Sequence, residues 1–371
     1  MPGPTKGDGR ANGRDIRPQR SGLIAAYLLV AVAIAGSAAL IFGDVTAAAP
    51  QVVEKAAAAA ASPTPAPVQS LPLPLRPPPS GFRSLSPAEL TAMSEITTDG
   101  LRLPRISPDG WMPWIANARR FDPSGPRARI GLLMINLGAS EAAMKRAIEE
   151  LPAEVSLAFL PGTPDLPRWL AQARVFGHES YLMLPIEDQG AGERGIRAID
   201  SNADTAENLR RLRLAMARGA GYVGLVVSSP GPVTQSETIL RPLVKEMADR
   251  GLGLVEINPA PGAAAVQRLT DELGAGYARS ADVLDYKLAG EGVLGNLDRL
   301  AAWVAQSPSG RSARHAFGVM QPDDETIDAI VTWSKRLRER STMSFVPLIG
   351  HFECRDACMA RLQAQPAQLR P

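Results

Sequence analysis

The sequence predicts an α/β fold in which helices cover a parallel sheet, with one transmembrane helix before the folded part. From Arg129 onward, short apolar runs alternate with stretches of helical periodicity in units of roughly 25–35 residues. Ahead of this part, Leu23–Gly43 carries no charged residue. A length of 371 residues is enough for one large α/β domain with extensions.

The N-terminal segment has the features of a membrane anchor. About twenty apolar residues span a bilayer as a helix, and Leu23–Gly43 has that length. The basic residues that precede it are Lys6, Arg10, Arg14, Arg17 and Arg20, whereas Asp44 follows directly. This asymmetry predicts a single-pass inner-membrane protein whose folded domain lies in the periplasm. A cleaved signal peptide is the alternative, because small residues follow at Thr46–Ala49.

Composition shifts divide the chain into parts. We expect a cytoplasmic basic segment (1–22), the transmembrane helix (23–43), an Ala/Pro-rich linker (44–80), a lead-in segment (81–128), the α/β domain (129–348) and a C-terminal tail (349–371). The linker cannot bury a core and acts as a semi-rigid spacer. A formal net charge of +2 gives no indication of nucleic-acid binding.

Apolar runs bounded by turn residues predict the strands of the domain. They are Ile130–Asn136, Val155–Leu160, Ser180–Leu184, Tyr222–Ser228, Leu252–Ile257, Tyr277–Ala278, Ala316–Met320 and Met343–Pro347. Apolar residues at helical spacing predict helices around 209–216, 240–247 and 327–337, the last capped by Asp323 or Asp324. Periodicity alone fits both a barrel and an open doubly wound sheet.

The two cysteines leave three interpretations open. Cys354 and Cys358 lie near the C-terminus, and an exported protein can form a disulfide between them if one lies in a loop. A zinc site with His351 lacks the usual four ligands. The third interpretation is an ordinary tail.

Familiar catalytic motifs are missing from the sequence. Neither a G-x-S-x-G elbow nor a Walker loop occurs. The chain has three histidines, and none forms a His-x-x-x-His pair. His178 precedes a strand, where a structural hydrogen bond is the more common role.

Residues 129–348 resemble the divergent polysaccharide deacetylase family, relatives of the NodB-type carbohydrate esterases. No single motif is specific, but the order and spacing of the motifs are. In chain order they are Leu137-Gly138, Ala147-Ile148, Leu151-Pro152, Val155 to Pro161, Ala173-Arg174, Gly177-His178-Glu179, Leu184 to Glu187, Gly221 to Gly224 and Phe345 to Leu348. The resemblance implies a distorted (β/α) barrel. In active relatives it also implies a metal-dependent deacetylase that acts on carbohydrate.

The same resemblance indicates that the metal site is degenerate. In active relatives the first strand ends in Ile-Asp-Asp-x-Gly, and here the two Asp positions are Ile135 and Asn136. An Asn-Asn-His stretch falls on 226–228, which reads Val-Val-Ser, and a His in the strand after Gly-His-Glu falls on Met183. Gly-His-Pro-His-Pro falls on 320–324, which reads Met-Gln-Pro-Asp-Asp. We therefore expect no metal and no cofactor.

Polar groups remain at positions that could line the former site. The candidate ligand-binding residues are Asn136, His178, Glu187, Ser228, Glu256 and Gln321. The favoured interpretation is a catalytically silent domain that binds envelope polysaccharide or a protein partner. An active hydrolase using His178, Glu187 and Glu256 is one alternative, and an envelope scaffold that binds nothing small is the other.

Overall fold

The computed structural model describes residues 81–121, 127–186, 196–257, 264–283, 292–306, 315–339 and 343–363. The predicted transmembrane helix, the linker and Glu187 lie outside these ranges. Among the helices of the described ranges, none is long and apolar enough to cross a membrane.

The core of the domain is a parallel sheet that follows the predicted strands. Its members are β3 (Ala128–Leu137), β4 (Ser156–Phe159), β5 (Ser180–Met183), β6 (Gly224–Ser228), β7 (Gly253–Ile257), β8 (Tyr277–Arg279), β9 (Asp282–Val283), β10 (His315–Met320) and β11 (Met343–Phe345). Their spatial order is β8-β7-β6-β5-β4-β3-β10-β9, and β11 pairs with the first residues of β3. All eight predicted strands are present, and the sequence analysis missed the short β9.

One continuous stretch of chain brings the two edges of this sheet together. β8 pairs with β7 and β9 pairs with β10, yet only Ser280 and Ala281 separate β8 from β9. The N–H of Ser280 donates to the carbonyl of Glu256 in β7, and the N–H of Ala281 donates to the carbonyl of Phe317 in β10. Seven of these strands, β3 to β8 and β10, therefore form a nearly closed barrel, and the short β9 and β11 add to β10 and β3. Of the two arrangements that the periodicity allowed, the structure therefore confirms the α/β barrel and excludes the open sheet.

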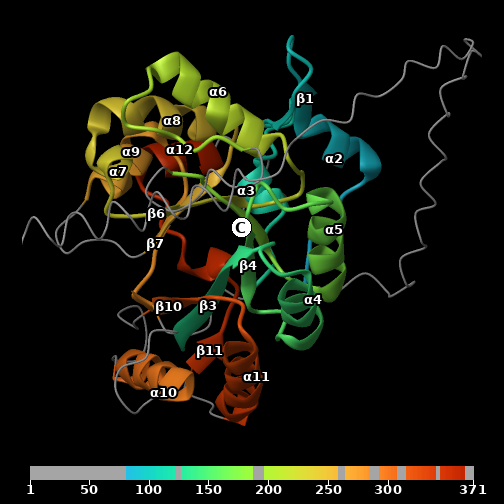
Figure 1. Cartoon of the computed structure of the whole chain (residues 1–371), viewed down its shortest axis with the longest axis vertical. Helices are drawn as coiled ribbons and strands as arrows, with labels where there is room; N and C mark the ends of the chain where they lie inside the picture. The colour runs from blue at the N-terminus through green and yellow to red at the C-terminus, as the bar shows by residue number, and fades with distance from the viewer. Residues whose placement is uncertain are drawn as a thin grey trace, which may run out of the picture. The chain divides into compact units, whose positions relative to one another are not determined.

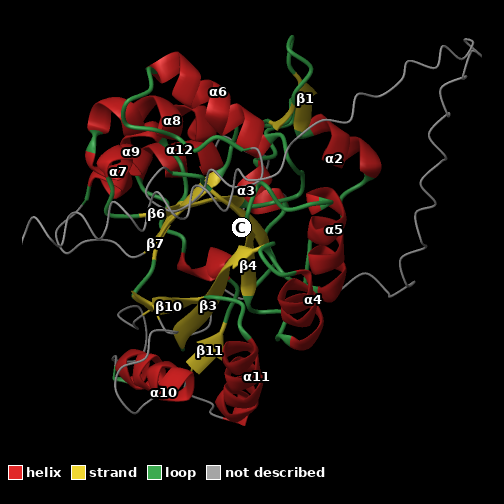
Figure 2. Cartoon of the chain, viewed as in Figure 1, coloured by secondary structure: helices red, strands yellow, loops and turns green. Residues whose placement is uncertain are grey.

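Helices surround the strands, which gather in the centre of the domain (Figures 1 and 2). They are α4 (Glu141–Glu150), α5 (Leu166–Phe176), α6 (Thr205–Met216), α7 (Pro232–Gln235), α8 (Glu237–Asp249), α9 (Ala265–Leu273), α10 (Gly292–Ala305), α11 (Asp324–Glu339) and α12 (Asp356–Gln363). The Asp323 carboxylate accepts a hydrogen bond from the N–H of Thr326, which confirms the predicted cap of α11.

Alternation along the strands separates two apolar clusters. Residues such as Leu132, Leu157 and Leu254 pack outward against the helices. Residues of opposite parity, such as Leu133, Ala158 and Val255, belong to a second cluster inside the barrel. Both faces of the strands are therefore buried, which explains why each strand is an almost continuous apolar run in the sequence.

The amino-terminal end of the barrel is filled by two segments from outside the strands. One is α3 (Pro113–Ala116) of the lead-in segment, and the other is the 3-10 helix η3 (Leu348–His351) with the residue that follows it. The rings of Trp114 and Tyr181 stack on the ring of Phe352, at centroid distances of 5.5 and 6.4 Å. Residues 349–352, which the sequence analysis assigned to a tail, thus pack in the barrel interior.

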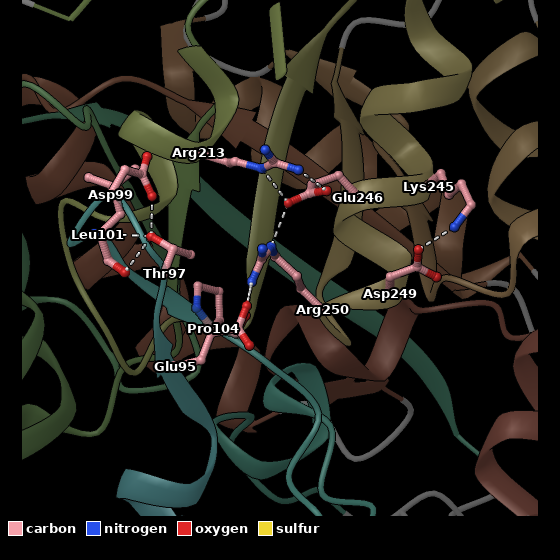
Figure 3. Close-up of polar contacts among 10 residues, drawn as sticks. All are labelled: Glu95, Thr97, Asp99, Leu101, Pro104, Arg213, Lys245, Glu246, Asp249 and Arg250. Carbon is pink, nitrogen blue, oxygen red and sulfur yellow. Dashed lines mark hydrogen bonds and ion pairs between the residues drawn. The ribbon is translucent and has the colours of Figure 1, made fainter. Parts of the chain in front are cut away.

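Ion pairs fix the lead-in segment to the outer helices. This segment also contains α2 (Pro87–Ala92) and an antiparallel hairpin of β1 (Ser94–Ile96) and β2 (Arg102–Pro104). The Arg250 guanidinium lies 2.8 Å from Glu95 of the hairpin and 2.8 Å from Glu246 of α8 (Figure 3). Arg213 of α6 also contacts Glu246, at 2.8 Å. These contacts hold the hairpin against α6 and α8.

The two cysteines form a disulfide. Cys354 precedes α12 and Cys358 lies within it, with Cα atoms 5.2 Å apart. One partner therefore lies in a loop, which was the condition for a disulfide at this spacing.

Candidate functional site

A β-bulge shapes the carboxyl-terminal end of β3. Met134 pairs with Leu157 and Leu137 pairs with Phe159, so β3 contributes one residue more than β4 between these positions. Within the bulge, Asn136 has a φ of 57°, in the left-handed region. Asparagine tolerates this region better than most residues do. Bulges of this kind redirect a side chain and are common beside functional sites.

The redirected side chain contacts a residue at the end of the neighbouring strand. The Asn136 Nδ2 donates to Gln321 Oε1 at 3.3 Å, and Gln321 directly follows β10. Asn136 is partly buried and Gln321 is exposed. We call these two residues the rim amide pair. Each amide offers a donor and an acceptor, as sugar hydroxyls require of a binding site.

The Leu137-Gly138 motif has a steric reason at this end of the barrel. Gly138 has a φ of 117°, and a Cβ built on it would lie 1.9 Å from Thr163 Oγ1. The Thr163 hydroxyl lies 2.7 Å from the carbonyl oxygen of Leu160, after β4. Only glycine permits this close approach, which fixes the loop after β4 beside the bulge.

Beneath the rim amide pair, the barrel interior is apolar. Ile135, Met183 and Val226, which the resemblance aligned with metal ligands of active relatives or their neighbours, belong to the interior cluster. Within the described ranges, no group of three or more His, Cys, Asp or Glu side chains could hold a metal ion. Aliphatic and thioether side chains do not fit a divalent cation that prefers oxygen and nitrogen ligands.

Ser228 lies at the same end of the barrel. It is the last residue of β6, is partly exposed and comes two residues after the interior Val226, so alternation places it on the interior side. Ser229 faces the other way and its hydroxyl donates to Glu256 Oε1 at 2.5 Å.

Glu256 does not join the rim amide pair. Its neighbours Val255 and Ile257 face the barrel interior, so Glu256 lies on the outer face of β7. It is 1% exposed, and the Tyr277 hydroxyl donates to its Oε2 at 2.5 Å. With the Ser229 bond, both carboxylate oxygens have partners inside the fold.

His178 lies at the opposite, amino-terminal end, just before β5. Its Nδ1 is 2.8 Å from the carbonyl oxygen of Val155, and its Nε2 is 3.1 Å from that of Ile148. Burial lowers its pKa, although the two carbonyl contacts oppose this shift. His178 therefore connects the end of α4 to the start of β4 and does not reach the rim.

The sequence analysis did not single out Glu179 as a functional candidate, although the Gly-His-Glu motif contains it. It is fully buried at the start of β5, and burial raises its pKa to about 7. Its Oε1 accepts from the N–H of Arg119 at 2.9 Å, and its Oε2 accepts from the N–H of Ile349 at 3.2 Å. The hydroxyls of Ser156 and Tyr181 also donate to Oε2, each at 3.1 Å. A single carboxyl group thus joins the lead-in segment and η3 to the barrel.

The profile of the divergent polysaccharide deacetylase family matches residues 133–349. The chain belongs to this family. No curated protein matches the sequence. Among solved structures, an uncharacterized protein from Agrobacterium tumefaciens C58 is similar with a TM-score of 0.59 and 25% identity, over 67% of this chain and 98% of its own.

A second solved structure shows a weaker likeness. It is a protein of Enterococcus faecalis V583 with a proposed role in cellobiose-phosphate cleavage. It has a TM-score of 0.42 and 11% identity, over 60% of this chain and 97% of its own. At that score the likeness carries no argument about this protein.

Proposed function

We propose that this family member binds envelope polysaccharide at the carboxyl-terminal rim of its barrel without hydrolysing it. The rim amide pair carries the proposal, because the β3 bulge directs Asn136 toward Gln321. Amide groups beside an apolar floor suit a sugar, whose hydroxyls need hydrogen bonds and whose ring faces are apolar. Ser228, at the end of β6, adds a hydroxyl at the same end.

A hydrolytic role finds less support in the geometry. Metal-assisted deacetylation needs a cation to polarise the acetyl carbonyl and a nearby base to activate water. His178 lies at the other end of the barrel, and Glu256 is hydrogen-bonded on the outer face of β7. Of the three residues considered for an active hydrolase, His178 and Glu256 therefore do not lie at a common reaction site.

Binding at the rim is tested with N-acetylglucosamine oligomers and their deacetylated counterparts, titrated into the full-length protein and followed by calorimetry. We expect saturable binding that weakens at least tenfold in Asn136→Gly, which keeps the left-handed backbone, and in Gln321→Met. Gln172→Met is the matched control, because Gln172 is an amide on α5 whose side chain donates to Glu149, away from the rim. Affinity unchanged by both rim substitutions, or no saturable binding, would contradict the proposal.

The proposed location is the periplasmic face of the inner membrane. Leu23–Gly43 is uncharged and follows a basic segment, which supports a helix with its N-terminus in the cytoplasm. The disulfide between Cys354 and Cys358 suits an oxidising compartment. Alkaline phosphatase fused after Ser80 should be active. An inactive fusion, with a cytoplasmic reporter active at the same position, would reverse the orientation.

A further inference from the structure

A cavity of about 360 Å³ lies between the lead-in segment and α5. The lead-in wall comes from α2, the β1–β2 hairpin and α3, and the opposite wall from α5 and the loop 219–222 that leads into β6. Loops that lead into strands lie at the amino-terminal end of a barrel, so this cavity is distinct from the rim. We call it the lead-in cavity. Its volume falls within the usual range for small-ligand sites, about 300–1,000 Å³.

Most of the cavity wall is aliphatic. Met93 and Leu103 line it from the lead-in segment and Leu170 from α5, with Leu90 at 45% exposure. Gly219 lines it as well, and a Cβ built there would lie 2.4 Å from a methyl group of Leu170. Such a surface suits the apolar part of a small molecule.

Arg174 brings a positive charge to this cavity, and it has no negatively charged partner among the described residues. Its guanidinium lies 4.3 Å from the centre of the Phe82 ring, and Nη1 lies 3.5 Å from the carbonyl oxygen of Asn117. Burial lowers the pKa of Arg174. None of the ion pairs among the described residues involves it. A partly desolvated arginine is usually paired with a carboxylate or a bound anion.

Arg102 adds a second guanidinium to the same cavity. It is exposed, and its Nη1 donates to the Ser94 hydroxyl at 3.2 Å. Within the part of the chain that the structure describes, it too has no carboxylate partner. By contrast, Arg213 and Arg250, which hold the same hairpin, are both paired with Glu246 (Figure 3).

Asn117 lines the cavity, but its side-chain oxygen is buried behind the wall without a partner among the described residues, so it offers no acceptor to a ligand. Its Nδ2 donates to the carbonyl oxygen of Tyr222 at 3.2 Å, and its Oδ1 is buried without a hydrogen bond. Exchanging the two amide atoms would place Oδ1 against a carbonyl, which can only accept, so the orientation is fixed.

We propose that the lead-in cavity binds a small amphipathic anion. Its oxyanion group, a carboxylate or a phosphate monoester, pairs with Arg174 and Arg102, and its apolar part packs against the aliphatic wall. Guanidinium groups match both kinds of oxyanion. The cavity lies at the amino-terminal end of the barrel, away from the rim, so the site does not depend on the proposed rim function.

The test uses the full-length protein in a neutral detergent with four water-soluble probes. These are hexanoate, hexyl phosphate, the uncharged hexanamide and inorganic phosphate, each followed by calorimetry. We expect saturable binding of hexanoate or hexyl phosphate, and the tighter of the two identifies the headgroup. Hexanamide and inorganic phosphate should each bind at least tenfold more weakly, because hexanamide lacks the negative charge and inorganic phosphate lacks the apolar chain.

Substitutions locate the binding. Arg174→Met keeps an apolar stem and should weaken binding of the charged probe at least tenfold, and the exposed Arg102→Gln should weaken it severalfold without a folding risk. Arg168→Met is the matched control, because Arg168 is also on α5 but lies over the Trp169 ring and outside the cavity. Ala171→Leu, on the exposed cavity wall, should reduce the affinity by filling space. Equal binding of hexanoate and hexanamide, affinity unchanged in both Arg102→Gln and Ala171→Leu, or no saturable binding of any probe would overturn the proposal.

Discussion

At the amino-terminal end of the barrel, a buried carboxyl group gathers four hydrogen bonds, whereas at the carboxyl-terminal rim two neutral amides lie above an apolar interior. Barrel enzymes usually place their ionisable groups at the second of these ends and reserve the first for stability. Among the described carboxyl groups, the one whose pKa is raised by burial, to about 7, is Glu179, at the end associated with stability. A perturbed pKa therefore marks a site of structural attachment in this barrel.

The difference between the two ends makes Glu179 the most costly residue to replace. Glu179→Leu leaves the partly buried N–H groups of Arg119 and Ile349 and the buried hydroxyls of Ser156 and Tyr181 without this acceptor, so we expect a loss of about 3–5 kcal/mol in the free energy of unfolding. Urea denaturation measures this loss. Glu149→Leu, on the exposed face of α4, is the control and should change stability by about 0.5 kcal/mol or less. Equal losses of stability in the two variants would contradict a stabilising role of Glu179 at the amino-terminal end.

The disulfide near the amino-terminal end should have the next largest effect. Replacing both Cys354 and Cys358 by Ala removes a short covalent loop, for which chain entropy predicts a cost of about 2 kcal/mol. Thermal unfolding of the double variant, compared with the oxidised wild type, measures it. A double variant as stable as the oxidised wild type would show that the disulfide does not hold α12.

Stability should also depend on pH through Glu179. Its pKa is about 7 when folded and ordinary when unfolded, so the folded state binds more protons between pH 4.5 and 7. This contribution is complete below pH 4.5 and is lost as the pH rises through 7, at up to about 1.4 kcal/mol per pH unit. The lowered pKa values of His178 and of His351, the latter about 3, act in the opposite direction below pH 6.5.

The comparison of wild type with Glu179→Gln separates these contributions, because both proteins share the histidines. The difference between their unfolding free energies should fall as the pH rises from 4.5 to 7. Parallel pH profiles would show that Glu179 does not titrate in this range.

At the rim, substitutions should affect stability least. Asn136→Gly retains the backbone freedom that a φ of 57° requires and removes one exposed hydrogen bond, so we expect a change of about 1 kcal/mol or less. Chemical denaturation measures it alongside Glu179→Leu. A loss as large as that of Glu179→Leu would make the rim amide pair a structural element.

The strands were predictable because each is an apolar run bounded by turn residues. The face of the sheet on which a given side chain lies was not predictable. Both faces of these strands are apolar, so the sequence does not show which residues point into the barrel. Glu256 was expected at the rim for this reason, whereas Val255 and Ile257 take the interior positions. Amphipathic helices such as α8 were predictable from their 3.6-residue period.

Other features depend on contacts that no local pattern encodes. The bulge at Asn136 follows from the mismatch of two strand registers, so the sequence could show the amide but not the direction of its side chain. Phe352 gave no sign of entering the barrel, because its stacking partners Trp114 and Tyr181 are distant in the chain. The role of Glu179 required knowing that two remote segments meet at one carboxyl group.

The central claim, a carboxyl-terminal rim that binds sugar without chemistry, is tested most directly by acetate release. The full-length protein is incubated with an N-acetylglucosamine oligomer that it binds, with chelator and then with zinc or cobalt, and acetate is quantified. We predict that acetate stays at the level of the protein-free blank in both conditions while the oligomer remains bound. Metal-dependent release of acetate that is lost in Asn136→Gly would contradict the account.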